Sequence, residues 1–393
     1  MNAVEKNVLT SSFLGDNFLL DTSVSRRLFH GNAEMLPVID YRSRLNPASI
    51  AENRPFTDIT ELWLNADGRK QAVMRQCGVD QKFLAEGDAS SWEKFLAWSK
   101  LLPDLCGHPL YVLSHLELKR VFGNETPLSE ATAKAVYEAC NLQLSHDALT
   151  PRGLLKNYRV EALCTTDDPI DDLRHHQTLK KAWADVAILP TWCPERAMHI
   201  GQPGFAEYVE SLERVVGMDI RHFNDLADAL QKRHDFFAGN GCVLSDYGAY
   251  VAYTEPYTDS QVETIFEKSM RGQQLPALEV RQFRHAFLRR SVEMDKQEGW
   301  VQLHAPANDD MRSLLHRSMQ QGALGRFVGV AAYSESFMGF SVHETFRRLL
   351  CAVLGQAVGE GTLPEDDVLL GELMEKVAYG NARNSLQLPV AAR

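Results

Sequence analysis

The chain has 393 residues, of which 45% are hydrophobic and 24% are charged, values ordinary for a soluble globular protein. Its formal net charge of −11 argues against non-specific binding to nucleic acid or to anionic membranes. The sequence has seven cysteines without a CxxC pair, no signal-peptide pattern and no apolar run near the ~20 residues of a membrane span. We therefore expect a cytoplasmic protein with reduced thiols and with neither a membrane nor a nucleic-acid partner.

Six short apolar runs are predicted to be strands. They are β-branched or apolar throughout rather than alternating, which is typical of parallel strands covered on both faces. Amphipathic helices are predicted between them, for example over 91–102, 211–218 and 225–237, and strand alternating with helix predicts a parallel sheet or barrel. The six runs span residues 36–42, 159–169, 185–192, 241–248, 299–306 and 327–334.

The segment 48–150 contains no convincing strand. We predict helices there, with Ser91 and Ser129 as residues that accept the first unpaired amide hydrogen bonds of a helix. The favoured organisation is one α/β barrel domain over 1–393 with this segment as a helical insertion after the first strand. Two independent domains are the alternative.

Polar residues follow the predicted strands, where the loops of a parallel barrel converge over one mouth. They include no metal-binding cluster with a recognisable spacing. The residues are Arg42, Ser43, Arg44, Thr165, Thr166, Asp167, Asp168, Cys193, Asp246, Tyr247, His304, Tyr333 and Glu335.

Several motifs together resemble the uronate isomerases, the glucuronate/galacturonate isomerase family of the amidohydrolase superfamily. The resemblance implies a (β/α)₈ barrel of the TIM type with a helical insertion, in agreement with the predicted elements. The motifs are ELWL at 61–64, EKFLAWSKLLPDLCGHPLYVLSHLELKRVFG at 93–123, CTTDDPIDDLRHH at 164–176, LPTW at 189–192, HETFRRLLC at 343–351 and YGNA at 379–382.

The chain departs from the family where the resemblance implies chemistry. In the family the first strand ends in His-x-His, which binds a divalent metal, zinc or manganese; here these positions are Arg42 and Arg44. A guanidinium stays protonated and offers a metal no lone pair. We therefore predict that the chain uses no metal cofactor. The other departures from the family's metal, catalytic or substrate positions are Gly68, Arg69, Cys193, Tyr247, Tyr333, Glu335 and Val342.

A segment of the family pattern is also missing. The run GWVQLHAPANDD at 299–310 passes directly into a helix that resembles the one before the eighth strand. Two β/α units of roughly 30 residues each are therefore expected to be absent, leaving six strands. Exposed parallel edges favour association, so we expect a homo-oligomer or a complex with another chain.

Three functions follow. The favoured one is a non-catalytic homologue that acts as a partner or regulatory subunit. The second is a metal-independent enzyme acting on a small anionic substrate, with Cys193 as nucleophile and His304 and Asp246 as base and orienting group. The third is retained D-glucuronate/D-galacturonate isomerase activity. The candidate ligand-binding residues are Arg42, Arg44, Asp167, Asp168, Tyr247, Tyr333, Glu335 and His343.

Each candidate also has a structural interpretation. Cys193 can be a small apolar filler, His304 a hydrogen-bonded structural histidine, and Asp167 and Asp168 caps of the following helix. Arg42 and Arg44 either bind a carboxylate or phosphate, whose geometry matches an arginine fork, or form internal ion pairs. The structural interpretation predicts at least one of these arginines within salt-bridge distance of Glu335 or Asp246.

Overall fold

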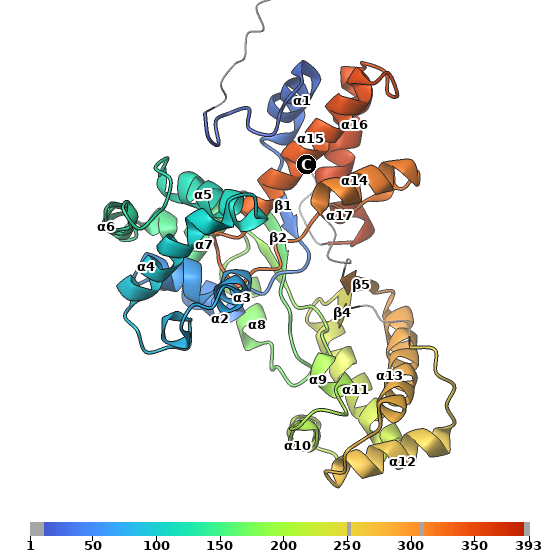
Figure 1. Ribbon diagram of the computed structural model, residues 1–393. Coiled ribbons are helices and arrows are strands. Elements are labelled where there is room, and N and C mark those ends of the chain that lie inside the picture. Colours follow the sequence, from blue (N-terminus) through green and yellow to red (C-terminus); the bar gives the residue numbers. More distant parts are fainter. Residues whose placement is uncertain (1–11, 250–252, 306–309, 389–393) are drawn as a thin grey trace, which may run out of the picture. The chain divides into compact units, whose positions relative to one another are not determined.

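The computed structural model describes residues 12–249, 253–305 and 310–388 (Figure 1). Its contacts divide the chain into two compact units. Unit 1 comprises 1–161 and 310–385, and unit 2 comprises 162–309 and 386–393. No helix in the described ranges is both long and apolar enough to span a membrane. The single barrel domain stays a prediction.

Unit 1 is mostly helical and contains one short strand, β1, near its start. The second strand, β2 (Val160–Cys164), crosses the boundary between the units. The other elements of unit 1 are α1 (Ser23–Leu28), η1 (Phe29–Ala33), β1 (Val38–Asp40), α2 (Pro47–Glu52), η2 (Thr60–Asn65), α3 (Gly68–Gln76), η3 (Gln81–Phe83), α4 (Ser91–Leu101), η4 (Leu102–Leu105), α5 (Pro109–Phe122), α6 (Ala133–Gln143), η5 (Asp147–Leu149), α7 (Pro151–Asn157), α14 (Met311–Gln320), η6 (Leu324–Arg326), α15 (Ser341–Gly359), α16 (Asp367–Glu375), η7 (Lys376–Gly380) and α17 (Asn381–Ser385).

Unit 2 alternates strands and helices. Its elements after β2 are α8 (Arg174–Ala182), β3 (Ala187–Leu189), α9 (Glu195–Met198), α10 (Phe205–Val216), α11 (Phe223–Gly239), β4 (Leu244–Ala249), α12 (Asp259–Met270), α13 (Ala277–Glu298) and β5 (Val301–Ala305). The aromatic side chains of Phe205, Phe266 and Phe283 pack edge to face in its core. These contacts join α10, α12 and α13, which lie together in Figure 1.

The strands of unit 2 pair in parallel, as predicted from their continuous apolar runs. Ala162 of β2 pairs with Ala187 of β3, and Leu244 of β4 pairs with Val301 of β5. Trp192, just after β3, forms parallel bridges to Asp167 and to Ser245. The carboxyl ends of β2 and β3 and the strand β4 therefore lie side by side, which brings their polar residues into one region.

The prediction of a strand over 327–334 is wrong, because this segment forms no strand. This segment lies beside β1 but forms no regular ladder: the Ala332 amide donates to the Asp40 side chain over 2.8 Å, and the Arg44 amide to the Ser334 carbonyl over 3.2 Å. Tyr333 has a φ of +47°. The left-handed conformation of Tyr333 interrupts the extended backbone. The Ala332 amide donates to the Asp40 carboxylate and is therefore not available for a hydrogen bond to a neighbouring strand, so no strand forms.

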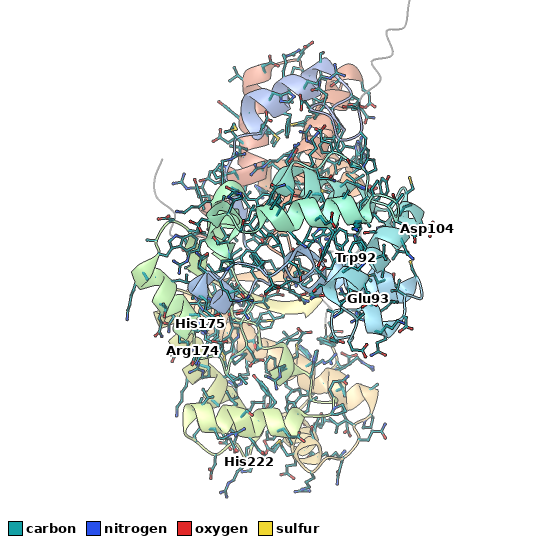
Figure 2. All side chains as sticks on the ribbon, turned by 90° about the vertical axis from the view of Figure 1, so that its left-hand side faces the viewer. Trp92, Glu93, Asp104, Arg174, His175 and His222 are labelled. Carbon is teal, nitrogen blue, oxygen red and sulfur yellow. The ribbon has the colours of Figure 1, made fainter. Side chains whose placement is uncertain are left out.

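The helical insertion is confirmed, since residues 48–150 form helices and turns without a strand. The predicted cap of α4 is off by one residue: Ser90 and Glu93 form a reciprocal capping box, and Glu93 is labelled in Figure 2. Ser129 does not cap α6 with its side chain either. Its backbone carbonyl accepts from Thr132 and Ala133, because a turn precedes the helix.

Candidate functional site at the strand ends

The end of β1 is occupied by two arginines that stack on one tyrosine. The guanidinium carbons of Arg42 and Arg44 lie 4.5 and 4.1 Å from the centroid of the Tyr333 ring. Arg44 also donates to the Tyr333 hydroxyl, and its Nη1 lies 3.6 Å from Oε1 of Glu335. The predicted ion pair to Glu335 is therefore confirmed.

This cluster, which we call the arginine–tyrosine stack (Arg42, Arg44, Tyr333 and Glu335), is partly open to solvent. Arg42 is buried, whereas the side chains of Arg44 and Glu335 are 40% and 42% exposed. At such exposure an ion pair contributes about 0–1 kcal/mol and a cation–π contact about 0.5–1 kcal/mol. The Arg44–Glu335 ion pair and the Arg44–Tyr333 contact are therefore each modest in free energy.

Neighbouring residues shape the stack. A Cβ atom on Gly68 would lie 3.3 Å from Oε2 of Glu335, so the glycine leaves room for that carboxylate. Asp40 is fully buried below the stack, and loss of hydration raises the pKa of its carboxyl to about 7. Its hydrogen bonds from the Ala332 and Arg42 amides hold the end of β1 against the segment before α15.

The other candidates at strand ends lie in unit 2. Asp167 is 4% exposed and accepts hydrogen bonds from the Thr165 hydroxyl over 2.7 Å and the Thr191 amide over 3.1 Å. Burial raises the pKa of its carboxyl to about 7. These bonds tie the ends of β2 and β3 together, so Asp167 is engaged in the scaffold.

Asp168 has a different set of partners. Its Oδ1 accepts from the Ile170 amide over 3.1 Å and from the Tyr208 hydroxyl over 3.2 Å, and burial raises its pKa. Neither aspartate caps α8, whose N-cap residue is Leu173. The helix-cap interpretation is therefore wrong: the chain makes an extra turn after Pro169 before α8 begins.

Cys193 has the environment of a filler rather than that of an activated nucleophile. Burial, with a contribution from the negative charge of Asp246, raises the pKa of its thiol to about 12. The lowered pKa considered from the sequence is not found, because burial, followed by the charges of Asp246 and Glu195, raises the pKa of this thiol. Asp246 is itself buried, and its Oδ1 accepts from the Gly248 amide over 2.9 Å.

Tyr247 does not face an open site. Its hydroxyl donates to Asp295 over 2.8 Å, within a buried network that the sequence analysis missed. Asp295, on α13, also accepts from Ser245 and Gln302 over 2.8 Å and lies 3.1 Å from His234 Nε2. The available signal was an acidic residue on the face of α13 that carries Phe283, Phe287 and Met294.

The two candidate histidines lie on α15 and on β5. His343 is on α15, 4% exposed, with its Nε2 3.9 Å from Oδ1 of Asp40. Burial and the charge of Arg347 lower the pKa of His343 to about 3, so its ring is neutral at pH 7. His304 lies on β5, but its side chain is outside the described residues.

Only one group of three possible metal ligands is found in the described part of the chain. It consists of His222, Glu263 and Glu267, whose ligand atoms lie within 4.8 Å of one another. His222 is at the surface of unit 2 (Figure 2) and pairs with Glu263 over 2.6 Å. This group involves none of the strand-end candidates.

The chain matches known proteins over nearly its whole length. The family model of glucuronate isomerase matches residues 10–323 and 305–386. Uronate isomerase of Bacteroides thetaiotaomicron is 33% identical over 462 aligned residues, with 95% of this chain and 99% of the relative covered. Uronate isomerase of Pectobacterium atrosepticum is also 33% identical, over 461 residues, with 95% and 98% covered.

Solved structures of uronate and glucuronate isomerases also resemble this chain. The crystal structure of uronate isomerase from Thermotoga maritima has a TM-score of 0.84 at 27% identity and covers 95% of this chain and 99% of its own. That of glucuronate isomerase from Caulobacter crescentus has a TM-score of 0.83 at 19% identity, with 94% and 95% covered, which supports the fold alone.

Parallel strands separated by helices, with polar residues where the strands end, define an α/β-barrel protein of the TIM type. Within that class, the chain belongs to the uronate (glucuronate) isomerase family.

It is a shortened member. The alignments extend over 462 positions, more than the 393 residues present, so the relatives contain segments that this chain lacks. The two spans matched by the family model overlap at 305–323, where the predicted gap lies.

Proposed function

We propose that this chain is a uronate isomerase homologue without the family's metal site and catalytic residues, and that it acts as a non-catalytic partner or regulatory subunit. The observation that carries the proposal is the arginine–tyrosine stack at the end of β1. Two guanidinium groups stand there, against one tyrosine ring, where the resemblance implies two metal-binding imidazoles.

A divalent metal does not fit this set of donors. Guanidinium groups are cationic and have no lone pair for a metal. Glu335 offers a carboxylate, but it is paired with Arg44 over 3.6 Å. Asp40 is fully buried, and the raised pKa of its carboxyl favours the neutral form up to about pH 7. These residues therefore support no catalytic step through a metal.

The acid–base groups of unit 2 also support a structural role. The most perturbed carboxyl at a strand end, Asp167, is held by Thr165 and Thr191, and the pKa of the Cys193 thiol is raised rather than lowered. General acid–base or nucleophilic catalysis needs a group that is both reachable and poised near the working pH. The metal-independent enzyme is therefore the weaker proposal.

A partner chain is part of the proposal. In unit 2, β4 and β5 form a two-stranded sheet among the described residues, so β5 pairs on one side within that unit. Strand edges are protected in stable proteins or are used for association. A second copy or a longer relative of the family would extend this sheet.

Metal retention tests the proposal directly. The purified protein, equilibrated with zinc or manganese and then desalted, is expected to keep less than 0.1 equivalent by elemental analysis. The double variant Arg42→His/Arg44→His is the matched comparison, because it restores two imidazoles at the same positions. Retention of one equivalent by the unaltered chain, lost in Arg42→Ala, would contradict the proposal.

Retained isomerase activity is the second candidate. It is favoured by the 33% identity to proteins named uronate isomerase over 95% of the chain. It requires a base, an acid at the carbonyl and cations for the substrate carboxylate; of these, Arg42 and Arg44 supply only the cations.

A further inference from the structure

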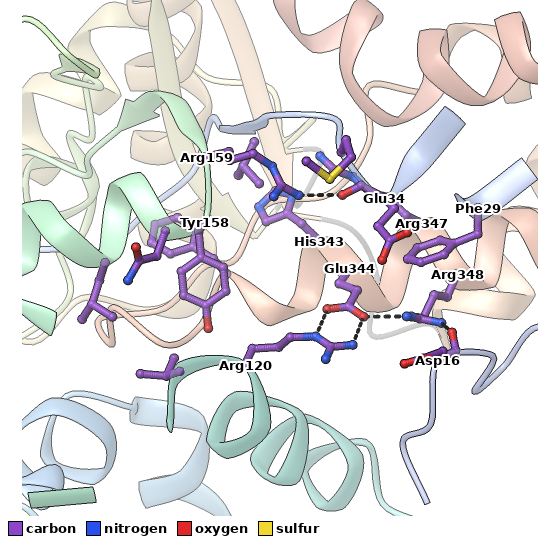
Figure 3. A pocket seen from close by; sticks show the side chains of 16 residues that line it. Asp16, Phe29, Glu34, Arg120, Tyr158, Arg159, His343, Glu344, Arg347 and Arg348 are labelled. Atoms are coloured by element: carbon purple, nitrogen blue, oxygen red, sulfur yellow. Dashed lines mark hydrogen bonds and ion pairs between the residues drawn. The ribbon is translucent and has the colours of Figure 1, made fainter. Parts of the chain in front are cut away.

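Unit 1 contains a cavity of about 350 Å³ that is separate from the arginine–tyrosine stack (Figure 3). Its lining includes Met35, which precedes β1, and Arg159, which precedes β2, whereas Arg42 and Arg44 follow β1. The cavity and the stack therefore lie toward opposite ends of β1. The volume falls in the range of small-molecule sites.

The lining carries more positive than negative charge. It contains four arginines and three acidic residues. The carboxylate of one of these acids, Glu344, is already paired with two arginines. It accepts two hydrogen bonds of 2.7 Å from Arg120 and one of 2.9 Å from Arg348, as Figure 3 shows. A second acid, Glu34, pairs with His30 over 2.9 Å.

The other two arginines have no acidic partner within salt-bridge distance among the described residues. Arg347 is 4% exposed and donates to the backbone carbonyls of Ala33, Leu36 and Pro37. Arg159 is exposed and donates one Nη2 hydrogen bond of 2.6 Å to the Glu34 carbonyl. Burial, followed by the nearby charge of Arg159, lowers the pKa of Arg347 to about 10. Arg347 is thus a buried cation that the charge of Arg159 disfavours, and an anion bound beside both arginines would offset this repulsion.

The lining also contains His343, which is 4% exposed. Its Nε2 lies 3.9 Å from Oδ1 of Asp40 and forms no hydrogen bond among the described residues, so the case for a ligand rests on the arginines. The remaining surface includes Phe29, Leu154 and Tyr158, which suit the carbon skeleton of a small molecule.

We propose that this cavity binds the oxyanion group, a carboxylate or a phosphate, of a sugar-sized metabolite. Arg159 supplies the fork of N–H donors, Arg347 supplies buried positive charge, and His343 is part of the lining. Arginine recognises both oxyanions through paired hydrogen bonds. The site goes beyond the proposed function, because it does not use the stack at the end of β1.

Isothermal titration calorimetry with sodium phosphate and with sodium D-glucuronate tests this site, against sodium chloride at equal ionic strength. We expect saturable binding of at least one probe, and at least a tenfold weaker affinity in Arg159→Gln. Tighter phosphate binding assigns a phosphorylated ligand, and tighter glucuronate binding assigns a sugar acid. Both outcomes support the oxyanion site.

Three further variants keep the test decisive. Val121→Glu, which places a negative charge in the lining, is expected to abolish binding even if Arg159→Gln does not fold. Arg174→Gln removes an exposed arginine of unit 2 (Figure 2) and is expected to change nothing. Absence of saturable binding, unchanged affinity in Arg159→Gln and Val121→Glu, or loss of binding in Arg44→Gln alone would overturn the proposal.

Discussion

Removal of the Tyr247 hydroxyl tests whether this residue has a structural role. In Tyr247→Phe, Asp295 loses one of its hydrogen bonds of 2.8 Å but keeps those from Ser245 and Gln302. A hydrogen bond to a charged group contributes about 1.5–3 kcal/mol, so we expect the free energy of unfolding to fall by about 2 kcal/mol. Because Asp295 stays paired, the loss remains below that of a buried, unpaired carboxylate.

The assay is urea unfolding followed by circular dichroism, with hydrogen exchange of β4 and α13 peptides to locate the effect in unit 2. Tyr257→Phe is the matched control. Tyr257 is only half-buried and its hydroxyl makes no hydrogen bond within the described residues, so we expect a change below about 0.5 kcal/mol. Equal stability of Tyr247→Phe and the unaltered protein would refute the structural assignment.

Two other predictions concern unit 1. Since the pKa of the Asp40 carboxyl is raised to about 7, its contribution favours the fold at low pH and is lost as pH rises from about 4 to about 7. The stability of Asp40→Asn relative to the unaltered protein should therefore increase as pH rises from 5 to 8, as measured by thermal unfolding. A stability difference that does not change with pH would argue against this pKa. Ser90→Ala should destabilise the protein by roughly 0.5–2 kcal/mol through loss of the α4 cap, whereas the control Ser91→Ala should change stability by less than about 0.5 kcal/mol. A larger loss of stability in Ser91→Ala than in Ser90→Ala would identify Ser91 as the cap.

Much of the fold was predictable because local composition decides it. The apolar run at 159–169 contains β2 and the run at 241–248 contains β4 except for its last residue, Ala249. Their lack of alternation predicted parallel pairing correctly. The run at 327–334 has the same composition, yet forms no strand, because Asp40 binds the Ala332 amide and Tyr333 has a positive φ. Neither cause is visible in the composition of that run.

The site was predictable where charge alone sufficed. The pairing of Arg44 with Glu335 followed from opposite charges at the ends of two predicted strands, of which only the first forms. The partner of Tyr247 did not, because Asp295 lies 48 positions away on a helix, and only tertiary packing brings the two together. The raised pKa of Cys193 likewise depends on burial, which a strand-end position does not determine.

The central claim is tested most directly by turnover of D-glucuronate and D-galacturonate, scored as ketouronate formation by the purified protein with and without added zinc or manganese. The arginine–tyrosine stack predicts no turnover under any of these conditions, while a longer uronate isomerase assayed in parallel reacts. Clear turnover that a chelator abolishes would contradict the account and show that the family's chemistry survives beside Arg42 and Arg44.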